Sequence, residues 1–142
     1  MSLWNGTPRL DGVRVLLVER HRDVSEIVAE ALGQCGAQVI AVDSALEGLT
    51  QFKRERPDVV VSGLSLPDKD GYWLIRQIRD LPADEGGDTP AAAFTGCTTR
   101  EDRLKTLRAG FQFHVPKPAA LHQLTEVVAL LSLQREAPVL VH

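Results

Sequence analysis

The chain has 142 residues, of which 44% are apolar and 25% charged, and its net charge is −3 at pH 7. This length predicts one domain with a sizeable core, and the composition is ordinary for a globular protein. There is no basic block typical of nucleic-acid binding, no apolar run long enough to span a membrane and no signal-peptide pattern. We therefore expect a cytoplasmic domain that binds neither nucleic acid nor membrane, with Cys35 and Cys97 as reduced thiols.

The first half of the chain alternates short apolar runs with helical patterns. VRVLLV (13–18) predicts a buried strand, and the helix after it is expected to be capped by Asp23 and ended by Gly36. AQVIAV (37–42) predicts a second strand, and Ser44 is placed to cap the helix that follows it.

The second half continues the same alternation. It predicts, in chain order, a strand at 58–63, a helix from Gly71 to Arg79, a polar loop at 81–90, a strand at 91–96, a helix at about 99–109, a strand at 111–115 and a helix at about 119–133. We expect Asp68, Lys69 and Asp70 to serve turn and capping roles before the third helix.

This order is a strand followed by a helix, repeated five times. It predicts an α/β fold of three layers, with a doubly wound parallel sheet, right-handed crossovers and helices on both faces. The domain should cover 13–133. Residues 1–12 read as a tail that begins with a cloning remnant, and 134–142 read as a tail or linker.

In an open parallel sheet, binding sites lie beyond the carboxyl ends of the strands. Glu19 and Arg20 follow the first predicted strand, and Gly63 ends the third. Thr95 lies at the end of the fourth, and Lys117 follows the fifth. We therefore expect these residues, from four separate stretches, to gather at one end of the sheet.

The motifs at these positions resemble the receiver domain of two-component response regulators over about residues 13–133. The matching stretches are VLLV followed by an acidic residue, PDVVVSGLSLPDKDG, the Thr of AAAFTG, the AG of LRAGF and the KP of VPKP. The stretch GFQFHVPKP is also similar to receivers of hybrid sensor histidine kinases. The resemblance implies a flavodoxin-like (βα)5 fold with strand order 2-1-3-4-5.

In this family an aspartate after the third strand accepts a phosphoryl group, and two acidic residues after the first help to bind Mg²⁺. Thr95 and Lys117 match the positions that contact the phosphoryl group, and Glu19 conservatively matches the first acidic position. Arg20 reverses the charge of the second acidic position, and Gly63 leaves the acceptor position without a side chain.

The departures at Arg20 and Gly63 imply a degenerate receiver, which is not an enzyme and needs no Mg²⁺ or other cofactor. His114 falls where the family carries an aromatic switch residue that works with Thr95. We expect a phosphorylation-independent interaction module whose partner is a histidine kinase, an output domain or another receiver. The face of the fourth helix, fifth strand and fifth helix is the expected docking surface, and a homodimer could use the same face.

Several alternatives stay open at this point. Glu19 and Lys117 could form only a structural ion pair, and Arg20 could be a solvated loop residue or fill the place of the metal. Thr95 could bond only locally, and Gly63 could serve a tight turn. His114 and His21 read as a packed strand residue and a surface loop residue.

Two other functions remain as hypotheses. The domain could sense a small anion held by Arg20, Lys117 and backbone N–H groups. It could instead be a phosphorelay receiver with a substitute acceptor, such as the hydroxyl of Ser62 or Ser65.

Overall fold

The computed structural model describes residues 8–96, 99–117 and 121–136. Cys97, the Pro118 of the KP motif, the predicted start of the last helix at 119 and most of the two predicted tails lie outside these residues. The elements are β1 (Arg14–Val18), α1 (Arg22–Gln34), β2 (Gln38–Val42), α2 (Ala45–Glu55), β3 (Val59–Ser62), α3 (Gly71–Arg79), the short 3₁₀ helix η1 (Ala83–Glu85), β4 (Ala91–Thr95), α4 (Arg100–Ala109), β5 (Phe113–Pro116) and α5 (Leu121–Glu136).

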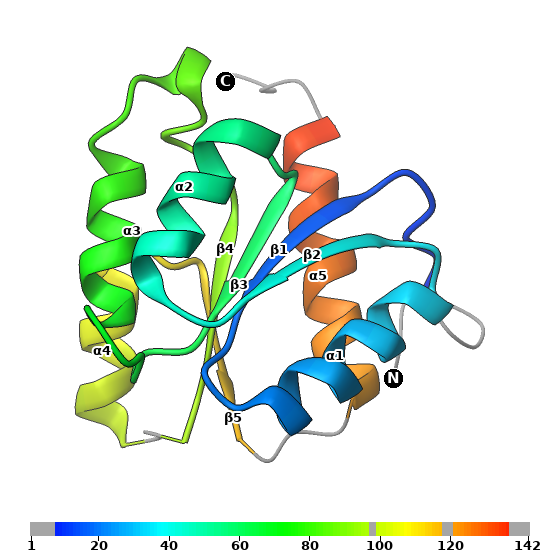
Figure 1. Ribbon diagram of the computed structural model, residues 1–142, viewed down its shortest axis with the longest axis horizontal. Helices are drawn as coiled ribbons and strands as arrows, with labels where there is room; N and C mark the ends of the chain where they lie inside the picture. The colour runs from blue at the N-terminus through cyan, green and yellow to red at the C-terminus, as the bar shows by residue number, and fades with distance from the viewer. Residues whose placement is uncertain (1–7, 97–98, 118–120, 137–142) are drawn as a thin grey trace.

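The five strands form one parallel sheet in the order β2-β1-β3-β4-β5 (Figure 1). This confirms the predicted fold class and strand order. β3 and β4 are buried along their whole length, because helices cover both faces of the sheet. The two edge strands, β2 and β5, are more exposed to solvent.

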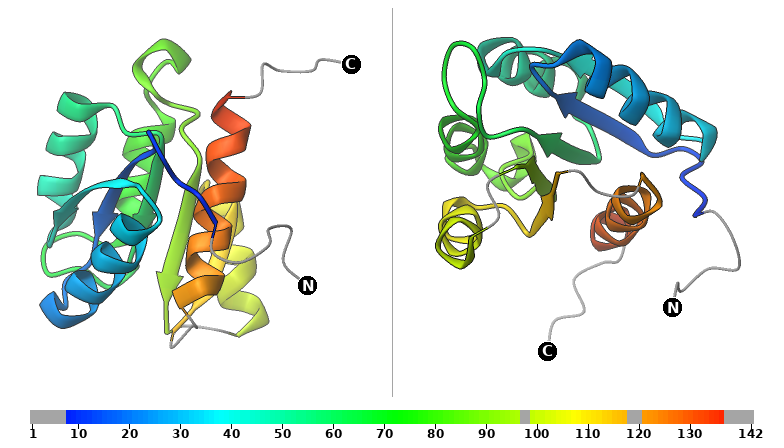
Figure 2. Two further views of the ribbon diagram at one scale, coloured as in Figure 1. Left: turned by 90° about the vertical axis from the view of Figure 1, so that its right-hand side faces the viewer. Right: turned by 90° about the horizontal axis from the view of Figure 1, so that it is seen from below.

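Two apolar clusters hold the layers together, one on each face of the sheet (Figure 2). The first packs α1 and α5 against side chains that include Val15, Leu17 and Val61. The second packs α2 and α3 against the alternate side chains, which include Leu16 and Val60. This alternation along each strand is what a sheet covered on both faces requires.

Arg79, at the end of α3, ties together the backbone of two loops. Its guanidinium donates hydrogen bonds to the carbonyl oxygens of Gly110 at 2.8 and 3.0 Å, Thr89 at 2.7 Å and Gly87 at 2.9 Å. The polar loop predicted at 81–90, which contains η1, is thereby fixed beside the turn between α4 and β5.

The predicted caps are partly confirmed. The Ser44 hydroxyl accepts a hydrogen bond from the Glu47 amide, and Gly36 follows the end of α1 with a φ of +103°. The prediction of Asp23 as the cap was wrong, since the N-cap position is His21, two residues earlier, and α1 begins at Arg22. The cause is the Glu19 carboxylate, which binds the His21 amide and turns the chain into the helix before Asp23.

Two boundaries in the last third of the chain also differ from prediction. β5 begins at Phe113 and not at Phe111, because Phe111 belongs to the closing turn of α4 and donates to Thr106 O. α5 continues to Glu136 and not to Leu133, since the next helix breaker in the sequence is Pro138.

α4 is the least embedded of the long helices. Thr106 is its one fully buried side chain, whereas Leu104 and Leu107 are 40% and 46% exposed. Among the described residues, no helix is both long and apolar enough to cross a membrane.

Candidate functional site

The structure brings Glu19 and Lys117 together at the carboxyl end of the sheet. The ammonium of Lys117 lies 2.7 Å from Oε1 of Glu19, whose side chain is only 2% exposed. Oε2 of Glu19 accepts a hydrogen bond from the His21 amide at 2.9 Å and lies 3.1 Å from His21 Nδ1. Both carboxylate oxygens of Glu19 therefore have protein partners.

The surroundings of Glu19 act on its pKa in opposite directions. Burial disfavours the charged carboxylate and by itself would raise the pKa. The hydrogen bonds and charge of Lys117, together with the hydrogen bonds from His21, outweigh burial and hold the pKa of Glu19 below its usual value. Glu19 is accordingly a carboxylate at neutral pH, and Lys117 is its counterion.

Gly63 lies beside this ion pair and has an ordinary backbone conformation. It is not among the glycines with positive φ, and its amide donates to Val18 O at 2.8 Å. A Cβ placed on Gly63 would lie 3.7 Å from Oε1 of Glu19 and 3.8 Å from the nearest Leu66 atom, which is ordinary contact. The tight-turn alternative for Gly63 therefore has no support in the geometry.

In the same loop, the position of Gly71 does require glycine. A Cβ on Gly71 would lie 2.3 Å from the carbonyl oxygen of Gly63, a distance that no packing tolerates. The Gly71 amide donates to Leu64 O at 2.8 Å, which holds the two backbone segments together. The close approach that excludes a side chain is thus at Gly71, whereas a side chain fits at Gly63.

The Arg20 side chain is exposed to solvent. Its guanidinium lies 3.4 Å from the Ser65 hydroxyl, across the loop that follows β3. This position agrees with the solvated-loop alternative for Arg20. It does not support a guanidinium that fills the place of the metal.

The side chains at this end of the sheet do not fit a Mg²⁺ ion. Mg²⁺ requires hard oxygen ligands. Oε1 of Glu19 is already bound to Lys117 and Oε2 to His21. Arg20 brings a positive charge where a second carboxylate would be needed, and Gly63 has no side chain to offer. Over the described ranges, no group of three or more acidic, histidine or cysteine side chains is arranged to hold a metal ion.

Thr95 and His114 also lie where the sequence predicted. Thr95 is buried at the end of β4, and its carbonyl oxygen accepts a hydrogen bond from the Lys117 amide at 2.8 Å. His114 Nδ1 lies 3.1 Å from the Thr106 hydroxyl. Because that hydroxyl donates to Asp102 O at 2.8 Å, it accepts from His114 Nδ1–H. His114 therefore connects β5 to α4 as a packed strand residue.

Two aspartates fix the loop that contains Gly63. Asp70 caps α3 by accepting from the Trp73 amide at 2.8 Å, as predicted. The Asp68 carboxylate instead accepts from the amides of Ala45 and Leu46, both at 2.9 Å, at the start of α2. Desolvation opposes the charge of Asp68, but these backbone hydrogen bonds hold its pKa below the usual value.

Sequence reasoning missed the contact between His21 and Glu19. His21 is 64% exposed, as a surface loop residue should be, but it supplies both an amide and a ring nitrogen to the buried carboxylate. The signal was the two-residue separation, which lets a carboxylate reach back to the amide at a helix start.

Comparison with known proteins places these residues in a family. The sequence model described as the response regulator receiver domain matches residues 15–129. The chain belongs to the response regulator receiver domain family.

Curated relatives agree with this assignment. The receiver is similar to a 14.6 kDa protein of Leptolyngbya boryana, with 34% identity over 80% of this chain and 86% of that protein. It is 32% identical to the response regulator MprA of Mycobacterium leprae, over 89% of this chain and 53% of MprA. The hybrid signal transduction histidine kinase D of Dictyostelium discoideum is 28% identical over 86% of this chain. The chain spans about half of MprA and 8% of the kinase.

Solved receiver structures share the fold. The receiver domain of the Francisella response regulator 1452 superposes with a TM-score of 0.80 at 19% identity, covering 87% of this chain and 98% of that one. A putative response regulator from Chloroflexus aurantiacus gives the same TM-score at 24% identity, covering 85% of this chain and 98% of that one. At these identities the likeness establishes the fold of the receiver.

Replacing Gly63 by alanine tests whether the backbone requires glycine there. Because the conformation is ordinary and the added methyl has room, Gly63→Ala should raise the free energy of unfolding by about 0.5 kcal/mol. Gly71→Ala, the matched comparison in the same loop, should lower it by about 2 kcal/mol through steric overlap. Urea denaturation measures both. A destabilised Gly63→Ala protein would show that Gly63 has a structural role.

The ion pair should make stability depend on pH in a defined direction. The pKa of Glu19 is lower in the folded protein than in the unfolded chain, so ionised Glu19 stabilises the fold at pH values above the unfolded pKa. This stabilisation is lost as the pH falls through the folded pKa. Lys117→Met leaves the buried carboxylate without its cation, so we expect a loss of about 2 kcal/mol at neutral pH.

The Lys117→Met deficit should shrink in acid, where Glu19 becomes protonated. Urea denaturation at a series of pH values measures it. Lys53→Met, which removes an exposed lysine from α2, is the control and should behave like the unmodified receiver at each pH. A Lys117→Met deficit that stays constant down to acid pH would argue against the ion pair as its cause.

Proposed function

We propose that this receiver domain of two-component signalling is degenerate and works as a protein-interaction or regulatory module without aspartyl phosphorylation. The observation that carries the proposal is the position of Gly63. A Cβ built on Gly63 would lie 3.7 Å from the Glu19 carboxylate, so Gly63 is at the acceptor position, but it offers no nucleophile. A receiver of this kind is not an enzyme and needs no cofactor, and its place is the cytoplasm.

The charges around Gly63 support the same proposal. The phosphoryl group transferred to a receiver is anionic and needs a metal ion beside it, and Mg²⁺ needs carboxylates. Here one carboxylate, Glu19, is neutralised by Lys117. Arg20 supplies no carboxylate at the second acidic position, and its exposed guanidinium lies beside Ser65, so a metal ion would lack a ligand on this side.

A signalling protein is the proposed partner, either a histidine kinase, an output domain or another receiver. The similarity to the hybrid kinase and to MprA supports this class of partner. The proposed docking surface comprises α4, β5 and α5, where Leu104, Leu107 and Leu121 are 40%, 46% and 39% exposed. α4 also carries more basic than acidic residues, which suits an acidic partner.

The two alternative functions have less support. An anion sensor would need the Lys117 ammonium, which is bound to Glu19 at 2.7 Å. A substitute acceptor at Ser62 would have to be reached inside the sheet, since Ser62 is fully buried and donates to Gly63 O at 2.8 Å. Ser65 is exposed, but Arg20 lies beside its hydroxyl.

Rebuilding the acidic site tests the proposed loss of phosphorylation. Gly63→Asp should accept little phosphate from acetyl phosphate, because Arg20 still leaves the second acidic position without a carboxylate for Mg²⁺. Arg20→Asp should bind metal partially but lacks an acceptor. The double variant places carboxylates at both positions beside Glu19, Thr95 and Lys117. It should gain far more than the two single changes together, since neighbouring sites couple.

The measurement is Mg²⁺-dependent incorporation of labelled phosphate into all four proteins, with circular dichroism to check that each is folded. The unmodified receiver should incorporate none above background. Labelling of the unmodified receiver equal to that of the double variant would show that the acceptor lies elsewhere and would overturn the proposal.

A further inference from the structure

β2 is an edge strand, and within the part of the chain that the structure describes no other segment pairs with its outer side. It pairs with β1 alone among the described strands, and its five residues, QVIAV, include no charge and no proline. Gln38 and Ala41 are exposed, and the other three residues are half-buried. Edge strands are usually protected against pairing by a charge, a proline or a cover, and the opposite edge, β5, ends in Pro116.

The hydrogen bonds to β1 identify the backbone groups that face outward. The Gln38 amide donates to Val13 O, and Val42 O accepts from the Glu19 amide, so both residues point their backbone groups toward β1. Because this direction alternates along a strand, Ile40 also faces β1, whereas Val39 and Ala41 face the open side. An added strand would bond to Val39 and Ala41.

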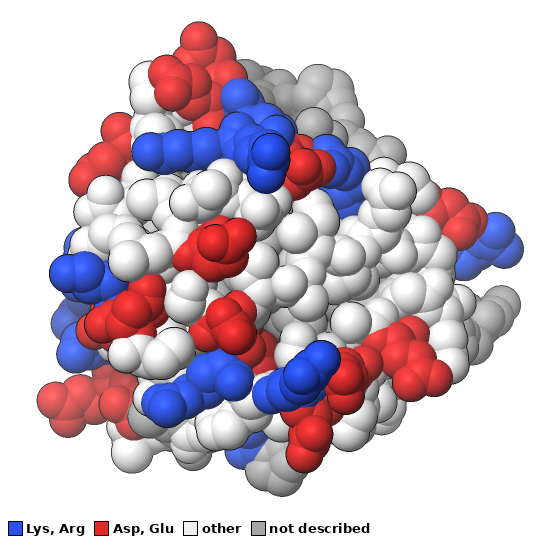
Figure 3. All heavy atoms as spheres, in the orientation of Figure 1, with Lys and Arg blue, Asp and Glu red and all other residues white. Residues whose placement is uncertain are grey.

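Two helices flank the open side of β2, one on each face of the sheet. A solvent-filled hollow of about 640 Å³ at the end of the strand is lined by Arg22 and Glu26 of α1, Ala41 and Val42 of β2, and Glu47 of α2, among others. Figure 3 shows this face, with charged side chains around an uncharged central area. These contacts identify the sides of α1 and α2 that border β2.

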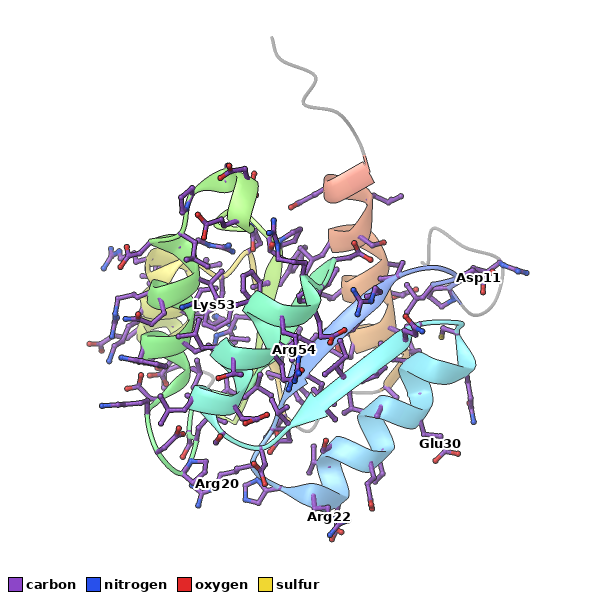
Figure 4. The ribbon with its side chains drawn as sticks, turned by 45° about the horizontal axis from the view of Figure 1, so that its top comes forward. Asp11, Arg20, Arg22, Glu30, Lys53 and Arg54 are labelled. Carbon is purple, nitrogen blue, oxygen red and sulfur yellow. The ribbon has the colours of Figure 1, made fainter. Side chains whose placement is uncertain are left out.

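The border of α2 carries opposite charges at its two ends. The residues at helical spacing along this border are Glu47, Gln51 and Arg54. The side-chain amide of Gln51 donates a hydrogen bond to the Glu47 carboxylate at 3.2 Å. The other side of α2 faces α3, where Gly48 approaches Leu74. Figure 4 shows Arg54 on the side of α2 toward the strands. Along β2 this border therefore runs from acidic to basic.

We propose that a second copy of this chain pairs with β2, antiparallel, through a twofold axis that passes beside Ile40. Val39 of each copy would then face Ala41 of the other, and each such pair exchanges two backbone hydrogen bonds. The twofold axis keeps each α2 on the same face as its copy and reverses its direction. Glu47 of one copy therefore lies toward Arg54 of the other, twice per dimer.

This charge pattern is the reason to name a second copy as the occupant. Parallel pairing of the same two edges would turn the second copy over and place its α1, not its α2, beside the α2 of the first copy. Only the antiparallel twofold pairing brings Glu47 of each copy toward Arg54 of the other. β2 lies at the opposite edge of the sheet from β5. The dimer consequently leaves the α4–β5–α5 surface free for another protein.

The first test blocks the outward hydrogen bonds of β2. Sedimentation equilibrium of the full chain over a range of concentrations should show a dimer. Ala41→Pro removes an outward amide without breaking a bond to β1, so it should raise the dimer dissociation constant at least about tenfold. Ala41→Thr keeps the amide and is the control. Circular dichroism checks that both variants are folded.

The second test reverses charges and does not depend on whether β2 tolerates a proline. Glu47→Arg and Arg54→Glu should each weaken self-association about tenfold, because each places like charges together. The double variant should restore the dimer. A mixture of the two single variants should form a heterodimer, since one copy then carries two arginines and the other two glutamates.

The outcomes decide the proposal in either direction. Loss of the dimer in Ala41→Pro and its recovery in the variant that combines Glu47→Arg with Arg54→Glu support the proposal. A monomeric unmodified chain, a dimer indifferent to Ala41→Pro, or single variants that fail to pair with each other would overturn it. A dimer dissociated by Leu107→Glu but not by Ala41→Pro would place the interface on the α4–β5–α5 surface and would also overturn it.

Discussion

The ion pair between Glu19 and Lys117 is the interaction on which the candidate site depends. Glu19 follows β1 and Lys117 follows β5, and β3 and β4 lie between these strands in the sheet. The pair therefore spans the carboxyl ends of two intervening strands, where Gly63 and Thr95 lie. A carboxylate that is 2% exposed is stable only with such a partner, since an uncompensated buried charge is costly.

The same interaction bears on the proposed loss of phosphotransfer. In a cluster of carboxylates, one lysine is attracted by several negative charges and a dication can still bind. Here Lys117 and Glu19 compensate each other, His21 takes the second carboxylate oxygen and Arg20 turns toward Ser65. The space beside Gly63 could hold a side chain, so the backbone does not require glycine at this position. This supports the proposal of a receiver that acts through its surface.

Much of the fold could be predicted from the sequence, because strands buried on both faces are continuous apolar runs and the helices carry clear amphipathic patterns. The positions of Glu19, Gly63, Thr95 and Lys117 followed from the strand ends. The prediction of the first helix start failed because two acidic residues compete for that role. Asp23 is a good capping residue, but Glu19 reaches the His21 amide first and the helix begins earlier.

Long-range contacts were also beyond a reading of the sequence. Asp68 was expected to act in its own loop, but its carboxylate binds amides at the start of α2, 23 residues away at Ala45. The hydrogen bonds of Arg79 to three loop carbonyls depend on the packing of α3 against the turn after α4. Such contacts have no periodic signal, because they are set by tertiary geometry.

The most direct measurement is an NMR titration of the unmodified receiver with Mg²⁺ and beryllofluoride, which bind to an acceptor aspartate and mimic its phosphorylated form. Without an acceptor carboxylate, and with Glu19 bound to Lys117, the amide resonances of Thr95, His114 and Lys117 should stay unchanged. Saturable shifts at these residues that require both reagents would contradict the account, because they would show that the site still binds a metal and a phosphoryl analogue.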